Sequence, residues 1–112
     1  PYKQVYSGTA TVYQIMNTPV DSIDIIVLLR FENIQTNNLN VNGQKLYLQT
    51  QNCTFVGQIQ KLFSVRDVLG RQEALCRFKS DNIKSVENQT VDFQITQYSG
   101  NLLQKMLGDI GL

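Results

Sequence analysis

Alternating apolar and polar positions recur along the chain and predict a mainly β fold. β-Branched and aromatic residues, which fit the pleated surface of a sheet, are concentrated in the same stretches. The pattern predicts strands over residues 9–16, 22–31, 45–49, 53–60 and 91–96. The last segment is the clearest, because Val91, Phe93 and Ile95 alternate with polar residues without interruption.

Residues 22–31 contain the longest apolar run of the chain, residues 25–29. Such a run fits a strand buried on both faces or a short buried helix, and its Ile and Val content favours the strand. The segment 33–43 is rich in amides and predicts a loop. It ends in Asn42-Gly43, a dipeptide that readily supplies the positive φ angles of a tight hairpin turn.

Two further segments have apolar residues at helical spacing. Residues 64–76 begin with Ser64 and Asp67 in a capping arrangement, but Gly70 interrupts the pattern, so helix and strand both remain open. Residues 101–108 predict a short amphipathic helix that ends at a glycine. Its apolar face, a candidate docking element or a cap on its own domain, consists of Leu102, Leu103, Met106 and Leu107.

The length of 112 residues suits one domain. We therefore expect a single domain over residues 1–112, a small β-barrel or β-sandwich with one or two short helices. The chain starts without Met and shows no signal-peptide pattern, which suggests a mature product or a domain excised from a longer chain.

The charge balance and the amide content argue against several classes of function. The chain has 10 basic and 9 acidic residues, so it lacks the strong field that attracts nucleic acid or an anionic membrane. It has no His, which removes the commonest general base and metal ligand. Asn and Gln are abundant, and they predict a neutral, hydrogen-bonding surface. We expect no cofactor, no metal and no enzymatic activity.

Ionisable groups still supply candidates for chemistry. Asp21 with Asp24, or Asp67 with Glu73, could act as an acid-base pair, but nothing in the sequence places either pair across a cleft. Six cations outnumber three acids between residues 61 and 84, which allows either a weak patch for an acidic partner or a mixed solvated face. These cations are Lys61, Arg66, Arg71, Arg77, Lys79 and Lys84.

Cys53 and Cys76 are the only thiols. Each borders or ends a strand-like segment, so a disulfide between them is feasible and would indicate an extracytoplasmic location. The alternative is two unrelated thiols in a reducing compartment. Two cysteines without His cannot close a four-ligand zinc site within one chain.

One stretch resembles the TraB family of conjugative-transfer proteins, the inner scaffold proteins of type IV secretion core complexes. In that family a Cys is followed four residues later by Gly, then by a Leu-Ser step and by Arg-x-Glu-x-Leu before a second Cys. The matching residues here run from Cys53 to Gly57, through Leu62 and Ser64, to residues 71–76. Upstream, residues 27–31 are similar to the family's entry into this region. The chain departs from the family at Lys61 and lacks the Gly-rich segment after the second Cys.

The resemblance implies a periplasmic, outer-membrane-associated β domain that packs into a ring. Its partners would be copies of itself, an outer-membrane lipoprotein and a strand-donating protein. We therefore expect a non-enzymatic structural or interaction domain of a secretion or conjugation complex, assembled through strand edges and amide contacts. The alternative is a secreted or surface β-rich binding module that is independent of a secretion apparatus.

Overall fold

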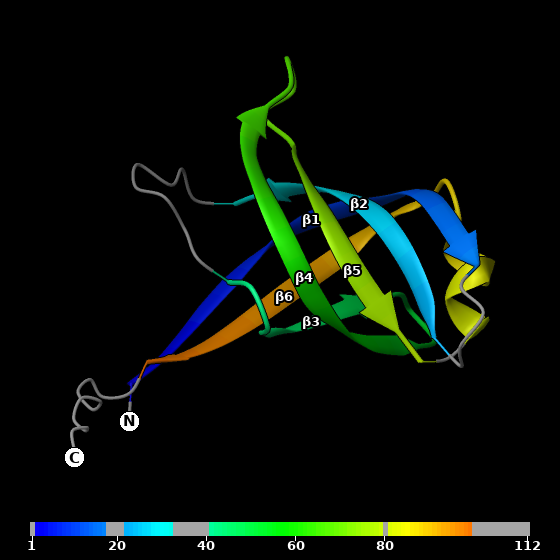
Figure 1. The fold of residues 1–112 in the computed structure, drawn as a ribbon, viewed down its shortest axis with the longest axis horizontal. Helices are drawn as coiled ribbons and strands as arrows, with labels where there is room; N and C mark the ends of the chain where they lie inside the picture. Colours follow the sequence, from blue (N-terminus) through cyan, green and yellow to red (C-terminus); the bar gives the residue numbers. More distant parts are fainter. Residues whose placement is uncertain (1, 18–21, 33–40, 80, 100–112) are drawn as a thin grey trace.

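A computed structural model describes residues 2–17, 22–32, 41–79 and 81–99 of the chain. These residues form six strands and one 3-10 helix, η1 (Figure 1). The elements in chain order are β1 (Tyr2–Asn17), β2 (Ile23–Phe31), β3 (Lys45–Gln49), β4 (Thr54–Arg66), β5 (Gln72–Phe78), η1 (Asp81–Val86) and β6 (Thr90–Ser99).

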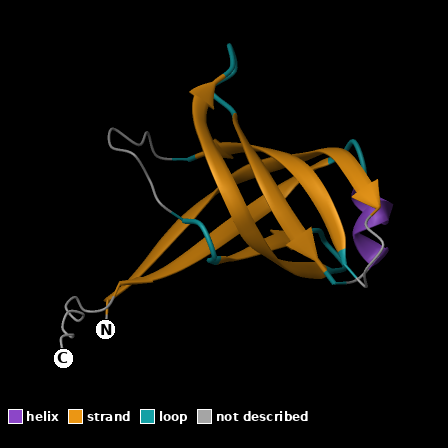
Figure 2. Ribbon diagram, in the orientation of Figure 1, coloured by secondary structure: helices purple, strands orange, loops and turns teal. Residues whose placement is uncertain are grey.

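The strands close into a barrel in the order β1-β2-β5-β4-β3-β6, and β6 returns to pair with β1. Every neighbouring pair is antiparallel. Figure 2 shows that strand dominates the described residues, with the short helix at one end of the barrel. The predicted mainly β fold is confirmed, and the architecture is a barrel rather than a sandwich.

The core lies inside the barrel because successive side chains of a strand point to opposite faces. In β2 the positions Ile23, Ile25, Val27 and Leu29 are buried, and the residues between them are half-buried. The same alternation governs β5, where Ala74, Cys76 and Phe78 face inward. The apolar run of residues 25–29 therefore buries one face fully, and helix is excluded there.

One end of the barrel is covered by η1. Ile83 and Val86 are buried against the core, while the turn that follows is bonded to β1 through Val12. The Val12 amide donates to the Gln89 carbonyl at 3.0 Å, and the Asn88 amide donates to the Val12 carbonyl at 2.7 Å. β1 has a register shift at this point, which leaves Tyr13 on the outside of the barrel.

The strand predictions hold, although the structure extends β1 and β4 beyond the predicted limits. Residues 64–76, open between helix and strand, form the end of β4, a turn and most of β5. Asn42 and Gly43 do form a turn, with Gly43 at a φ of 83°. The turn leads into β3, which pairs with β4 and β6 and not with β2. The predicted helix at 101–108 lies outside the described residues.

Candidate interaction surface

The candidate carboxylates lie apart in the structure and form no common site. Asp24, on the outer wall, accepts hydrogen bonds from its cross-strand neighbour Arg77, with Arg77 Nε at 2.9 Å from Oδ1. This contact raises the pKa of the Arg77 guanidinium. Asp67 lies in the β4–β5 turn, and Glu73 points outward from β5 opposite Leu28. Asp21 lies outside the described residues.

No group of three or more His, Cys, Asp or Glu side chains in the described part of the chain could hold a metal ion. Within the same residues, no helix is long and apolar enough to cross a membrane.

The predicted disulfide between Cys53 and Cys76 is wrong, since both thiols are free. Cys76 points into the barrel core opposite Ile59, and burial raises the pKa of its thiol to about 12. Cys53 lies in the exposed turn before β4, six positions ahead of Ile59. Six strand residues span about 20 Å, far more than the ~5.5 Å between the Cα atoms of a disulfide. Because the disulfide is absent, the cysteines no longer argue for an oxidising compartment.

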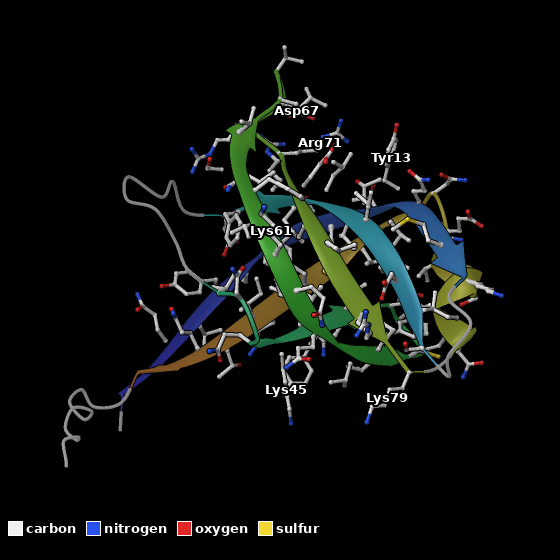
Figure 3. The ribbon with its side chains drawn as sticks, in the orientation of Figure 1. Tyr13, Lys45, Lys61, Asp67, Arg71 and Lys79 are labelled. Carbon is white, nitrogen blue, oxygen red and sulfur yellow. The ribbon has the colours of Figure 1, made fainter. Side chains whose placement is uncertain are left out.

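The six predicted cations also divide into separate groups. Lys61, Arg66 and Arg71 lie on the β4–β5 hairpin, whereas Arg77 and Lys79 lie at the opposite end of β5 and beyond it. Lys84 lies on η1. Figure 3 shows Lys61 below Asp67 and Arg71, with Lys79 at the far side of the barrel. Of the two alternatives that the sequence left open, the single patch of six cations is therefore not formed.

The β4–β5 hairpin rises past the barrel wall (Figure 1). Leu62 lies opposite Ala74 and Arg66 opposite Gln72, so four steps along β4 match two along β5. Such an irregularity bends the longer strand away from its partner. The Gln72 side chain partly compensates for it, because its amide donates to the Phe63 carbonyl at 3.0 Å. Residues 63–71 consequently form a projecting segment, which we term the hairpin tip.

Four apolar side chains are exposed on the hairpin tip, and we term them the tip cluster. Val68 is 101% exposed, Val65 80%, Leu69 57% and Phe63 37%. The pattern at 64–76 suggested an amphipathic element with a buried face, and the structure instead presents these residues to solvent. Three of the four lie within five positions, so the tip cluster concentrates exposed apolar side chains on one projection.

The turn at the hairpin tip is held by Asp67 (Figure 3). Asp67 Oδ1 accepts from the Leu69 amide at 2.9 Å and from the Arg71 amide at 2.8 Å. Asp67 Oδ2 accepts from Arg71 Nε at 2.8 Å. These hydrogen bonds, first of all the one from the Arg71 amide, lower the pKa of the Asp67 carboxyl. The sequence signal read as a helix cap is therefore an aspartate that caps a hairpin turn.

A depression of about 900 Å³ lies at the barrel mouth beside this hairpin. Its lining mixes both charges with amides, and Leu69 contributes one apolar side chain from the hairpin tip. The polar lining comprises Arg30, Glu32, Gln49, Arg66, Gln72, Asp92 and Gln94, among others. Three aromatic rings pack edge to face beside the depression. The ring centroids of Tyr6 and Phe31 lie 6.3 Å apart, and those of Phe31 and Phe93 lie 5.2 Å apart.

A strand edge remains open where β1 runs beyond β2. β1 pairs with β6 from Tyr2 to Thr11, but its pairing with β2 begins only at Gly8. The Ser7 carbonyl accepts from the Glu32 amide and therefore points to the β2 side. Because backbone groups of a strand alternate in direction, those of Val5 point to the same side. Among the described residues nothing pairs on this side with residues 2–6, which we term the open edge.

The sequence indicated the polar strand surfaces but not the hairpin tip or the open edge. Both depend on how far one strand continues past its neighbour, and the alternation pattern carries no such information.

Comparison of the chain with models of protein families, with curated proteins and with solved structures found no match.

Proposed function

We propose that the chain is a non-enzymatic structural domain of a bacterial secretion or conjugation complex of the type IV class. In this role it packs in the periplasm beside the outer membrane, against copies of itself and against an outer-membrane lipoprotein. Support comes from the sequence resemblance over residues 27–76 and from a β-barrel with an edge suited to joining another chain.

The observation that carries the proposal is the open edge. Each of the six strands has a partner on either side, but some strands continue past a neighbour: β1 runs beyond β2, and β4 runs beyond β3, which pairs with it only from Thr54 to Gln58. No residue that the structure describes bonds to the amides and carbonyls of the open edge on the β2 side, and an added strand would bond to them as in other β-augmented complexes. Val5 is about half-exposed, so its side chain does not block the approach.

The outer wall of the barrel carries polar amide side chains, which suit lateral contact with another protein. Outward positions on the strands include Gln49, Gln58 and Gln94, while Asp24 is neutralised by Arg77. Amides that find hydrogen-bond partners in another protein can be buried at a lower desolvation cost than charged groups. This composition favours a packed assembly over an isolated, highly charged domain.

The test places one charge on the open edge. Lysine on an edge strand opposes the approach of another strand, so Val5→Lys should weaken assembly. Val56→Lys is the matched control, because Val56 is equally exposed, at 49% against 48% for Val5, and lies in β4 opposite Tyr47.

Tagged chains would be extracted from the envelope of the native host with mild detergent and sedimented. We expect the wild type and Val56→Lys in a large particle with the secretion components, and Val5→Lys in slower fractions. A monomeric wild type that binds none of those components would refute the proposal, as would equal behaviour of the two variants.

The depression at the barrel mouth favours the second candidate, a secreted or surface binding module. A soluble ligand bound by Arg30 and Asp92 at the mouth, with no dependence on a secretion apparatus, would support that candidate instead.

A further inference from the structure

The hairpin tip combines three properties that the rest of the described surface lacks. Exposed apolar residues elsewhere stand singly and are about half-covered, as at Val5, Tyr13 and Val56. On the hairpin tip four of them gather on a narrow projection, and Val68 touches almost nothing of its own chain. An exposed apolar group of this kind marks a surface that binds a protein or a membrane when the protein functions.

The backbone of the turn is already prepared for removal from water. The Asp67 amide donates to the Arg71 carbonyl, and the Gly70 amide donates to the Asp67 carbonyl, both at 2.9 Å. The amides of Leu69 and Arg71 donate to the Asp67 carboxylate. The amides of four residues that flank Val68 thus have acceptors within the turn, which lowers the cost of moving this backbone into a low-dielectric environment.

The charged side chains of the hairpin lie in the turn and along the strands that lead to it. Asp67 is paired with Arg71 at 2.8 Å, so its negative charge is compensated. Arg66 and Lys61 add positive charge on β4, and Lys61 Nζ lies 5.0 Å from the centre of the Phe63 ring. Glu73 is the only other acid within this part of the hairpin. The result is an apolar extremity with a net positive base.

We infer that the tip cluster inserts into the interface of an anionic lipid bilayer, with Val68 and Leu69 among the upper acyl chains and Arg66 and Lys61 at the phosphates. Amphipathic membrane anchors share this arrangement, in which apolar groups enter the acyl boundary and cations contact the headgroups. The convex shape suits a deformable interface, and rigidity of the turn lowers the ordering cost of insertion.

A second copy of the chain is a poorer occupant. The depression that lies on the outer wall between β4 and β5 is flanked by Lys45 and Lys79, which would repel the cations of the hairpin. The small net charge of the whole chain does not oppose lipid binding, because only the charges within a few ångströms of the headgroups contribute strongly. The inference does not rest on the proposed assembly role, and its test needs only the purified chain.

The chain contains no Trp, so a single introduced Trp reports on one place without background. Val68→Trp puts the probe on the tip cluster, and Tyr13→Trp is the matched control on the barrel wall, where Tyr13 is 55% exposed. The probe partners are vesicles of phosphatidylglycerol and phosphatidylcholine in equal parts, vesicles of phosphatidylcholine alone, and anionic vesicles carrying brominated acyl chains.

We expect the emission of Val68→Trp to shift to shorter wavelength with anionic vesicles and to be quenched by brominated chains. The shift should fall with salt and be much smaller with phosphatidylcholine alone, while Tyr13→Trp should stay unchanged. In sedimentation with anionic vesicles, replacing Val68 and Leu69 together by Ser should weaken partition by about tenfold or more, since the removal of two apolar side chains from water is lost. Both positions are exposed, and circular dichroism checks that folding persists.

Three results would overturn the inference. The first is an unchanged Val68→Trp spectrum with every vesicle. The second is a blue shift that grows with protein concentration in the absence of lipid, which would assign the tip cluster to a second copy. The third is a blue shift that a purified secretion component produces and vesicles do not. That result would show that the tip cluster binds a protein pocket. None of these outcomes affects the sedimentation test of Val5→Lys, so the two proposals fail separately.

Discussion

The ring of Phe78 lies over the inward face of its cross-strand partner Gly57. A Cβ atom added to Gly57 would lie 2.6 Å from Cζ of Phe78 and 2.7 Å from two further ring atoms. Both positions face the barrel interior, and Phe78 is almost completely buried. The absence of a side chain at Gly57 is therefore what allows the most deeply buried phenylalanine of the core to lie flat inside the wall.

Replacing Gly57 by Ala should destabilise the barrel by about 1–3 kcal/mol, because the extra methyl group overpacks the core against a ring that is enclosed. Urea unfolding followed by circular dichroism measures the loss. The double variant Gly57→Ala with Phe78→Leu should lose less than the sum of the two single changes. Simple additivity would show that the ring and the added methyl group do not meet.

Stability should fall in alkaline solution because of Cys76. Burial raises the pKa of this thiol from 9.0 to about 12. The folded chain keeps the proton while the unfolded chain releases it, so this contribution is complete below pH 9 and declines as the pH rises towards 12. The decline is about 1.4 kcal/mol per pH unit in that interval. Unfolding free energies of wild type and Cys76→Ala, compared at pH 8 and above pH 10, isolate the effect.

The two thiols should differ in reactivity in the folded protein. Cys53 is exposed and Cys76 is buried, and only the ionised thiolate attacks a disulfide reagent. We expect one equivalent of a chromogenic aromatic disulfide to react quickly at pH 8 and the second only in denaturant. Cys53→Ser should remove the fast phase. Rapid reaction of two equivalents in the native protein would contradict the burial of Cys76.

The ion pair between Asp24 and Arg77 should contribute only modestly. Arg77 Nε lies 2.9 Å from the carboxylate, but the Arg77 side chain is 48% exposed. Pairs of this kind are worth about 0.2–1 kcal/mol and weaken with salt. A double-mutant cycle with Asp24→Asn and Arg77→Gln should give a coupling in that range at low salt. A coupling that salt leaves unchanged would indicate a drier environment than the structure shows.

Order in the hairpin turn should depend on the ionised form of Asp67. Hydrogen bonds to the carboxylate lower the pKa of this group, so the turn is held above pH 3.8 and released as the pH falls through the lower, folded pKa. Asp67→Asn should speed hydrogen exchange of the Leu69 and Arg71 amides, which donate to Asp67 Oδ1. Amides of β2 provide the control, since they should exchange as before.

The strands and their inward faces could be predicted from sequence because alternation is a local property. Residues 91–96 show this well, since the periodicity alone placed Val91, Phe93 and Ile95 inside the barrel. At 64–76 the local signal was ambiguous. Val65, Val68 and Leu69 look like one buried face, and only the pairing of β4 with β5 shows that they lie past the end of the wall. The wrong disulfide has the same origin, because the distance between two thiols is set by strand register.

Barrel closure also governs the order in which the chain can fold. The closing pair joins the first strand to the last, with Tyr2 beside Ser99 and Thr11 beside Thr90. Contacts between such distant parts of the chain form slowly, whereas the β3–β4 and β4–β5 hairpins are local. During synthesis β1 must therefore wait for β6, with one edge available to any other strand nearby. A newly made chain is most prone to aggregate in that interval, and a chaperone that covers β1 would protect the chain until β6 is made.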